Sequence, residues 1–351
     1  MKSMESRELS RKLFLTILKL SSFMFIASLF IVAYTQEKKL DSYKVQNGSY
    51  DKNIEISYND STNTFKSDKK NNDVDNFIAC YENPINQADF NEKLKSKLDE
   101  LYTLFSDSNY ILSFSYEDLY TGLHISYNEN QEYFAASTIK APVVLYVYEQ
   151  ADLGKLNLDS HMIYTSNFFV EGSGSLQYKD FGGTYTVRYL SEKAIVESDN
   201  IAYQMVSSSV DNNGIKNFWS SKGATTFWKS GVWCSGSAHD FVIYMKELYK
   251  YYLTDTKLSR ELMEYFYNSV FPLIKSNNGS KVAHKSGWRG EIMHDSAIVF
   301  DQYPYVVAIF TNKGGADYKD FFANTSNLIA EFHQIYWESK SNYCYNQAFK
   351  K

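Results

Sequence analysis

The distribution of apolar and polar positions divides the chain into three regions. Leu13 to Tyr34 forms a mostly apolar run of 22 residues, long enough to cross about 30 Å of hydrocarbon as a helix if Lys19 extends toward the basic side. Residues 36 to 76 consist largely of Asn, Asp, Ser and Lys, and they contain too few apolar positions to form a core. From Asp89 to Phe105 apolar residues return at helical spacing. The folded domain is therefore predicted to begin near residue 89.

Strand-like runs lie at both ends of this domain and helical patterns lie between them. The four runs form two hairpin patterns, at residues 111–116 with 123–127, and at residues 296–300 with 305–311. Helical and irregular patterns dominate residues 137–275, and a closing helix is predicted over 318–337. This order predicts an α+β fold in which an antiparallel sheet joins both ends of the domain, with helices on its flanks and a helical middle subdomain.

The N-terminal pattern predicts a membrane anchor. Basic residues precede the apolar run, so we expect the N-terminus to be cytoplasmic and the folded domain extracytoplasmic. The predicted segments are a basic flank and transmembrane anchor at 1–35, a flexible polar stalk at 36–88, the folded domain at 89–340 and a tail at 341–351. A cleaved signal peptide is the alternative, although the run is long for one and no clean A-x-A site follows it.

Composition narrows the function classes. The 351 residues allow about two domains, and 44% hydrophobic content suffices for a packed core. The 36 Lys and Arg against 41 Asp and Glu give a net charge of −5, which argues against a nucleic-acid partner. The three cysteines, Cys80, Cys234 and Cys344, are too few and too scattered for a disulfide scaffold or a Cys-based zinc cluster.

One candidate for nucleophilic chemistry is Ser137-Thr138-Ile139-Lys140, which opens a predicted helix. Residues three apart lie on one helical face, so Lys140 can accept the proton of Ser137 if burial or nearby cations lower the lysine pKa. The S-x-x-K pattern also occurs at Ser49 and Ser67, but both of those lie in the polar stretch. Only the Ser137 pattern therefore has a context in which the lysine can be buried.

Two further polar motifs follow in the same domain. Ser198-Asp199-Asn200 has apolar neighbours typical of a buried helical stretch, and Lys285-Ser286-Gly287 ends a strand-like run before the last hairpin. A second Lys-Ser-Gly occurs at residues 229–231, but no pair of strands follows it, so Lys285 is preferred. Together the motifs supply two hydroxyls, an amine and a further cation, which is the inventory of acyl transfer to serine.

In their order and contexts these motifs make the chain resemble the class A β-lactamases and their penicillin-recognising relatives, which carry S-x-x-K, S-D-N and K-[ST]-G. The resemblance covers residues 89–340. The gap of 61 residues between the first two motifs matches the family, whereas the gap of 87 between the last two is short. The resemblance implies catalytic roles for Ser137, Lys140, Ser198 and Lys285, and substrate binding by Asn200, Ser286, Gly287 and Trp288.

The roles implied by the resemblance describe one acyl transfer. Ser137 would be acylated with Lys140 as base, and Ser198 would relay a proton to the leaving nitrogen. Asn200 would hold the substrate amide, Lys285 would lend positive potential and Ser286 would bind a substrate carboxylate. The oxyanion hole would consist of the backbone N–H groups of Ser137 and Trp288.

One family feature is missing from this sequence. Class A β-lactamases use a glutamate in an E-x-x-L-N motif to activate the water that releases the acyl group. Between Asn200 and Lys285 the nearest match is Glu264 to Asn268, only 21 residues before Lys285 on an aromatic, helical stretch. Glu171 and Glu197 are alternative bases by proximity in sequence. Slow deacylation is therefore expected.

The leading prediction is an anchored serine acyl hydrolase of the class A β-lactamase type that needs no cofactor. A cell-wall D,D-peptidase acting on acyl-D-Ala-D-Ala is the alternative enzyme, and a sensor of wall fragments or β-lactams that does not turn over is the alternative of another class. His284, His294 and Asp295 lie near the third motif, but their spacing is weak support for a metal site. The expected partners are a small β-lactam or peptidoglycan-peptide substrate and, through one helix, the membrane. The sequence leaves the oligomeric state open.

The resemblance also suggests a partner for two of the cysteines. In the resembled fold the first and last helices of the domain pack side by side, and Cys80 precedes the first while Cys344 follows the last. Two alternatives stay open at this point, a disulfide between these two cysteines or free thiols on mobile tails. Cys234 is unpaired in both.

Overall fold

The computed structural model describes residues 42–44, 54–59, 80, 92–107, 109–226, 233–315 and 317–349. The chain divides into two compact units, and of the first, residues 1–43 and 59–68, only Ser42, Tyr43 and Asn59 are among the described residues. Ser42 and Tyr43 belong to strand β1 (Ser42–Lys44). The predicted anchor at 13–34 lies outside the described residues. No helix among the described residues is long and apolar enough to cross a membrane. The fold below is that of the second unit, residues 44–58 and 69–351.

An antiparallel sheet forms the centre of this unit and joins both ends of the domain, which confirms the predicted α+β fold. The strands run in the order β2-β4-β3-β11-β10-β9, with bounds Ile54–Asn59, Leu123–Tyr127, Leu112–Asp118, Tyr305–Thr311, Ile292–Phe300 and Lys281–Arg289. The early hairpin meets the late one where Phe114 of β3 lies opposite Ile309 of β11. The sheet therefore brings residues from positions about 200 apart in sequence into register.

Strand β2 corrects the prediction that residues 36–88 are a stalk throughout. Its sequence, IEISYN, pairs antiparallel with β4, with Ile54 opposite Tyr127 and Tyr58 opposite Leu123. The polar composition of the surrounding stretch conceals the short alternation of apolar and polar residues, which is the pattern of a β-strand.

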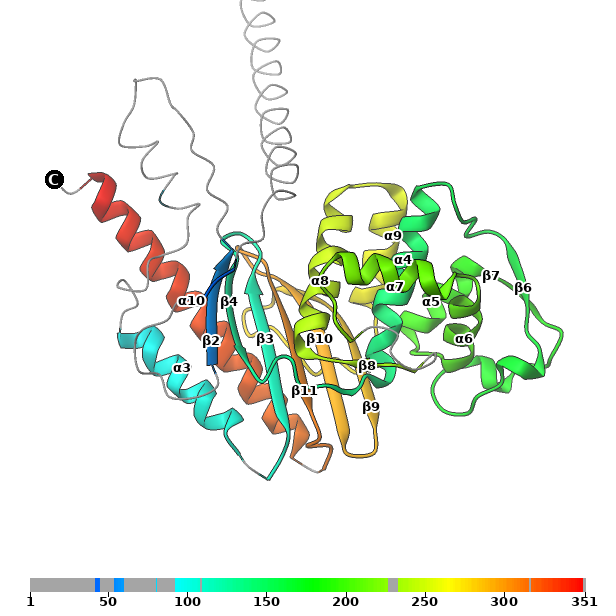
Figure 1. The fold of residues 1–351 in the computed structure, drawn as a ribbon, viewed down its shortest axis with the longest axis horizontal. Coiled ribbons are helices and arrows are strands. Elements are labelled where there is room, and N and C mark those ends of the chain that lie inside the picture. The colour runs from blue at the N-terminus through cyan, green and yellow to red at the C-terminus, as the bar shows by residue number, and fades with distance from the viewer. Residues whose placement is uncertain are drawn as a thin grey trace, which may run out of the picture. The chain divides into compact units, whose positions relative to one another are not determined.

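The sheet has a hydrophobic core on each face. Along β11 side chains alternate between the faces, since Val306 and Phe310 pack in one core and Val307 and Ile309 in the other. Helices α3 (Glu92–Phe105) and α10 (Tyr318–Phe349) cover one face, and α8 (Ala238–Leu253) and the helical subdomain lie against the other, as Figure 1 shows. Burial on both faces explains why β11 (YVVAIFT) is an almost continuous apolar run in sequence.

The helical subdomain occupies most of residues 136–267. Its helices are η2, α4, η3, η4, α5, α6, α7 and α9, with bounds Ala136–Ile139, Lys140–Asp152, Ser166–Phe168, Leu176–Tyr178, Val187–Val196, Asn200–Ser208, Asn212–Ser221 and Lys257–Tyr267. Two small sheets join its loops, and they pair β5 (Tyr133–Phe134) with β8 (Ser235–Gly236) and β6 (His161–Ile163) with β7 (Thr184–Thr186). Side-chain caps begin several of the helices, among them Asp199 at α6.

The closing helix is longer than its predicted range of 318–337, because α10 continues to Phe349 through the residues assigned to a tail. Cys344, on this added part, is fully buried and forms a disulfide with Cys80, with a Cα–Cα distance of 5.5 Å. Lys340 is also buried, and its Nζ donates to the Cys80 carbonyl at 3.3 Å. Of the two alternatives for these cysteines the structure therefore has the disulfide, and Cys234 is a free, buried thiol.

Candidate active site

Ser137 and Lys140 lie at the start of the helical subdomain, where η2 runs directly into α4. Ala136, just before the serine, has a φ of 49°, a left-handed conformation that is uncommon for a residue with a side chain. This turn presents the half-buried Ser137 toward Lys140, whose Nζ donates to Ser137 Oγ at 2.9 Å. The structure thus brings the two residues of the first motif into direct contact.

The second motif forms the turn between α5 and α6. Ser198 has a φ of 55°, and buried Asp199 fixes the turn by accepting from the backbone N–H of Ala202 and of Leu176, both at 2.8 Å. The turn is closed over Lys140, whose Nζ donates to Ser198 O at 2.6 Å and to Ser198 Oγ at 3.2 Å. Asn200 Oδ1 is a further acceptor of Lys140, at 2.8 Å. The lysine amine is therefore the point where the first two motifs meet.

The third motif lies on β9, at the edge of the sheet beside η2. Lys285 Nζ donates to Ser198 Oγ at 3.0 Å, so the Ser198 hydroxyl lies between two lysine amines. A Cβ at Gly287 would lie 2.8 Å from Ser137 N and 2.7 Å from Thr138 N, so only glycine permits β9 to approach the serine backbone this closely. Trp288, the next residue, has 64% of its surface exposed.

Burial controls the electrostatics of both lysines. Lys140 and Lys285 are fully inaccessible to solvent. Burial first, and then the nearby Lys285 charge, hold the pKa of Lys140 well below the usual lysine value. Burial lowers the pKa of Lys285 to about 8. A neutral amine at Lys140 beside a still charged Lys285 is the state in which the first can accept the Ser137 proton.

The side chains of Glu171 and Glu197, the two alternative bases, do not contact the Lys140 amine. Glu197 accepts from Lys193 Nζ at 2.5 Å and from Ser175 Oγ at 2.6 Å, so both of its carboxylate oxygens have partners outside the three motifs. Glu171 is exposed, and it contacts the site through its backbone, since its carbonyl accepts from Asn200 Nδ2 at 3.2 Å. The hydrogen-bond partners of the Lys140 amine among the described residues include no carboxylate.

The carboxylate-histidine group beside the third motif holds backbone segments together. His284 Nδ1 lies 3.2 Å from Asp295 Oδ1, and His284 Nε2 lies 3.0 Å from the Ser269 carbonyl. The other oxygen of Asp295 accepts from the backbone N–H of Leu273 and Ile274. These contacts clamp residues 269–274 to the sheet next to β9.

His294 performs a similar task on the Ser137 side of the sheet. Its Nδ1 accepts from the backbone N–H of Thr311 at 3.2 Å, so its Nε2 carries the proton and donates to the Phe134 carbonyl at 3.1 Å. Burial lowers the pKa of His294 to about 3. The imidazole is therefore neutral, and it fixes β5 three residues before Ser137.

Sequence reasoning missed the aromatic residues around Lys140. The ring centroid of Trp233 lies 5.5 Å from Lys140 Nζ and that of Tyr203 lies 6.0 Å from it. The two rings contact each other with centroids 5.0 Å apart. Tyr203 is identifiable in sequence as part of the apolar flank of the second motif, but no sequence pattern near Trp233 signals its position.

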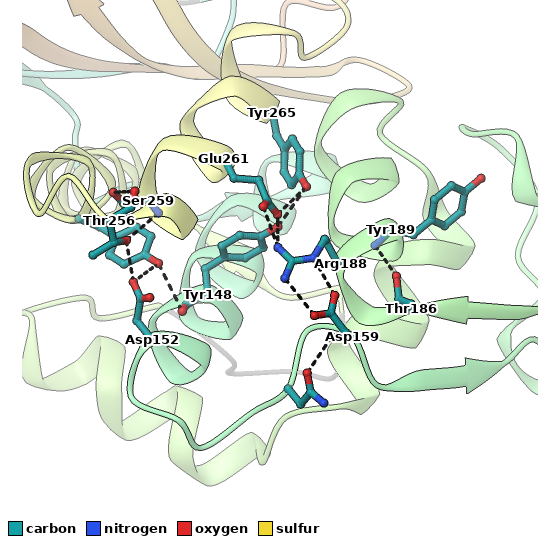
Figure 2. Close-up of polar contacts among 12 residues, drawn as sticks. Tyr148, Asp152, Asp159, Thr186, Arg188, Tyr189, Thr256, Ser259, Glu261 and Tyr265 are labelled. Carbon is teal, nitrogen blue, oxygen red and sulfur yellow. Dashed lines mark hydrogen bonds and ion pairs between the residues drawn. The ribbon is translucent and has the colours of Figure 1, made fainter.

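A polar cluster at the far end of α4 fixes the helix that carries Lys140 (Figure 2). Arg188 of α5 binds both oxygens of Glu261 of α9 through Nη1, at 2.5 and 2.7 Å, and its Nε donates to Asp159 at 2.9 Å. Tyr148 of α4 donates to Glu261 at 2.7 Å, and Tyr265 donates to the same oxygen at 3.0 Å. The cluster ties three helices together away from the three motifs.

Comparisons with known proteins agree with this geometry. The model of the beta-lactamase enzyme family matches residues 93–333, which is more than half of the chain. No curated protein matches the sequence.

Solved structures share the fold. They include a mutant of PBP-A as an acyl-enzyme complex with penicillin G, at 19% identity and a TM-score of 0.63 over 69% of this chain and 97% of that one. A β-lactamase from Sphaerobacter thermophilus has 16% identity and a TM-score of 0.59 over 69% and 97% of the two chains. An ancestral class A β-lactamase has 21% identity and a TM-score of 0.58 over 67% and 99%. With the family match, the chain therefore belongs to the beta-lactamase enzyme family, as a serine hydrolase-type enzyme of the β-lactamase and penicillin-binding-protein kind.

Proposed function

We propose that this protein is a serine acyl hydrolase of the class A type, in which β-lactams acylate Ser137 and the acyl-enzyme decays slowly. The observation that carries the proposal is the position of the Lys140 amine, which contacts the hydroxyls of both Ser137 and Ser198. The membership of the beta-lactamase family and the likeness to PBP-A, solved with penicillin G on the enzyme, support it.

Acylation then follows from the contacts. Ser137 Oγ forms a bond to the lactam carbonyl carbon and gives its proton to the neutral Lys140 amine. The carbonyl oxygen develops negative charge, which the backbone N–H of Ser137 and that of Trp288 on the adjacent strand β9 would stabilise. The carbon–nitrogen bond of the lactam breaks, and the nitrogen takes the Ser198 Oγ proton, which Lys140 replaces. The net change is an acyl-serine and a new N–H bond.

A cell-wall D,D-peptidase is the second candidate, and one observation favours it. Among the described residues no carboxylate is a hydrogen-bond partner of Lys140. A carboxylate base that would activate water to release a bound β-lactam is therefore missing beside this amine. A D,D-peptidase uses the same acyl-serine chemistry on acyl-D-Ala-D-Ala. A β-lactam then acts on it as a slow-release inhibitor.

The experiment is to mix the purified protein with penicillin G and follow the intact mass over time, with nitrocefin turnover measured in parallel. We expect one adduct per chain that persists for many minutes, and nitrocefin turnover far below the enzyme median of about 10 per second. A Lys140→Ala variant should acylate about 100-fold more slowly or worse. Absence of any adduct contradicts the proposal. Release of D-Ala from an added acyl-D-Ala-D-Ala peptide decides in favour of the peptidase.

We propose that the enzyme is held at the outer face of the cell membrane by residues 13–34. The support is the length of this apolar run and the basic residues before it. Cell fractionation should find the full chain in the membrane fraction, and protease added to intact cells should cleave it. Mature protein in the medium with an N-terminus near Thr35 indicates a cleaved signal peptide instead.

A further inference from the structure

The surroundings of the Lys140 amine consist of polar acceptors and two aromatic rings. Four oxygens accept from Nζ within 3.2 Å, and they belong to the side chains of Ser137, Ser198 and Asn200 and to the Ser198 backbone. The rings of Tyr203 and Trp233 lie within 6.0 Å of the same atom. Tyr203 is fully buried, whereas Trp233 is half-buried and so reaches solvent.

The backbone next to Trp233 is fixed against the serine loop. The carbonyl of the following residue, Cys234, accepts from Ala135 N at 3.1 Å, and β8 then pairs with β5. A Cβ at Gly236 would lie 2.5 Å from the Phe241 ring and 3.3 Å from Ala135 Cβ, so β8 is tightly packed. The residue after Trp233 is therefore hydrogen-bonded to Ala135, two residues before Ser137, and the indole lies beside the Lys140 amine.

From this arrangement we infer that Trp233 is a positioning residue that keeps water away from the Lys140 amine and so lengthens the life of the acyl-enzyme. The inference rests on the proposed function. The missing carboxylate allows the acyl group to be released slowly, and the inference names Trp233 as the side chain that makes this release slow.

The chemistry of release shows why water access matters. A water oxygen bonds to the acyl carbon and the bond from that carbon to Ser137 Oγ breaks. One proton of the water moves to Ser137 Oγ and the other stays on the released acid. A proton acceptor must hold the first proton in transit, and Lys140, which contacts Ser137 Oγ, is the acceptor within reach. Water that cannot approach the amine is not activated.

The same ring influences the amine itself. Loss of solvent is the largest cause of the lowered Lys140 pKa, and the half-buried indole is part of the cover that removes solvent. A cation–π contact acts in the opposite direction, but it is the smaller effect where burial dominates. Opening the cover therefore raises the pKa of Lys140 toward its ordinary value, and acylation then needs a higher pH.

The test compares Trp233→Ala with Trp233→Phe, which keeps a ring, and with Tyr178→Ala, which removes a ring that is 83% exposed and outside the three motifs. Penicillin G acylation is measured by stopped flow from pH 5 to 9, and decay of the adduct by intact mass. In Trp233→Ala we expect a rising limb of the acylation profile at higher pH and, with each protein compared at the pH of its fastest acylation, an adduct half-life about tenfold shorter. Trp233→Phe and Tyr178→Ala should match the wild type within about twofold.

An unchanged adduct half-life in Trp233→Ala, with acylation intact, overturns the inference while leaving the proposed function standing. Equal shortening in Trp233→Phe and Trp233→Ala also overturns it, because it indicates disturbed packing rather than water access. Wild-type protein that takes no adduct at all overturns the proposed function itself. If Trp233→Ala fails to fold, Trp233→Gln carries the same expectation.

Discussion

Two buried lysine amines share the hydroxyl of Ser198, at 3.2 Å from Lys140 and 3.0 Å from Lys285. Two like charges so close together, both removed from water, favour loss of a proton from one of them. Lys140 also contacts Ser137 Oγ, so it is the amine whose neutral form is useful. Lys285 lies on β9, where the substrate carboxylate is expected to bind. Its charged form is therefore the useful one, because a positive charge attracts that carboxylate.

This division of roles predicts a bell-shaped pH dependence of acylation. The rate rises with pH as Lys140 loses its proton, because only the neutral amine accepts from Ser137. It falls above about pH 8, where Lys285 loses its charge. Stopped-flow acylation by penicillin G from pH 5 to 10 measures both limbs, and Lys285→Ala should lack the falling limb. A rate that keeps rising above pH 9 speaks against the assignment.

The residues that carry the chemistry of this site could be predicted in part from the sequence. The three motifs supplied the hydroxyls and amines, because acyl transfer to serine needs these residue types and the motifs contain them. Trp233 was not accessible, since its role comes from a contact with Lys140 that depends on the pairing of β5 with β8. His284 was noticed only as a weak metal candidate, whereas its hydrogen bond to the Ser269 carbonyl is a backbone contact that sequence does not reveal.

Among the elements, the strands of the two hairpins were the most predictable from the sequence. The runs predicted at 123–127 and 305–311 have those bounds in β4 and β11, because β-branched and aromatic residues bounded by turns favour strands. β2 was missed since its six residues lie in a polar stretch. The end of α10 was missed because the disulfide and the buried Lys340, rather than an apolar stripe, hold its last turns.

The cluster in Figure 2 allows a matched test of helix packing. Glu261 and Asp159 both bind Arg188, but their side chains are 22% and 68% exposed. Glu261→Gln should lower the free energy of unfolding by about 1 to 3 kcal/mol, because it weakens the bonds of Arg188, Tyr148 and Tyr265 to a partly buried carboxylate. Asp159→Asn should cost less than Glu261→Gln, because water screens its mostly exposed carboxylate. Urea unfolding compares the two, and equal losses contradict the account.

The loop before β5 contains a second carboxylate whose contribution depends on pH. Glu129 Oε2 accepts from Ser115 Oγ at 2.8 Å and lies 2.9 Å from His124 Nε2 and 3.6 Å from His239 Nδ1. Burial opposes its charge, but the contacts with His124 and His239 outweigh burial and lower the pKa of Glu129. In turn, the nearby Glu129 carboxylate raises the pKa of His239.

The signs of these two shifts fix the pH window. The Glu129 contribution is present above its unfolded pKa of about 4.3 and is lost as pH falls through the lowered value. The His239 contribution is present below about 6.5 and is lost as pH rises through the raised value. Glu129→Gln should therefore destabilise the protein more at pH 6 than at pH 9. Urea unfolding at both pH values checks this, and a larger loss at pH 9 contradicts it.

At the scale of the whole molecule, early and late segments of the folded domain meet in two places. Strands β3 and β11 pair at the centre of the sheet, and the Cys80–Cys344 disulfide joins residues 264 apart in sequence. Sequence alone left this disulfide open, since pairing over such a separation depends on α10 continuing past its predicted end.

Loss of the disulfide should lower stability without disturbing the active site. In the chain-entropy model a closed loop of this length contributes roughly 4 to 5 kcal/mol, less any strain. The Cys80→Ser/Cys344→Ser variant should therefore unfold at lower urea concentration and be insensitive to reductant, while wild-type protein shifts to the variant's midpoint on reduction. Penicillin acylation of the folded variant should be unchanged. Equal midpoints for oxidised and reduced wild-type protein count against the cross-link.

The central claim is that one serine, activated by Lys140, receives the acyl group. Its most direct measurement is peptide mapping of the penicillin G adduct by tandem mass spectrometry, in the wild type and in Ser137→Ala, with circular dichroism to verify that the variant is folded. We predict that the wild type carries the penicilloyl group on Ser137 and that Ser137→Ala carries none. An adduct on another residue, or labelling that persists in folded Ser137→Ala, would contradict the account.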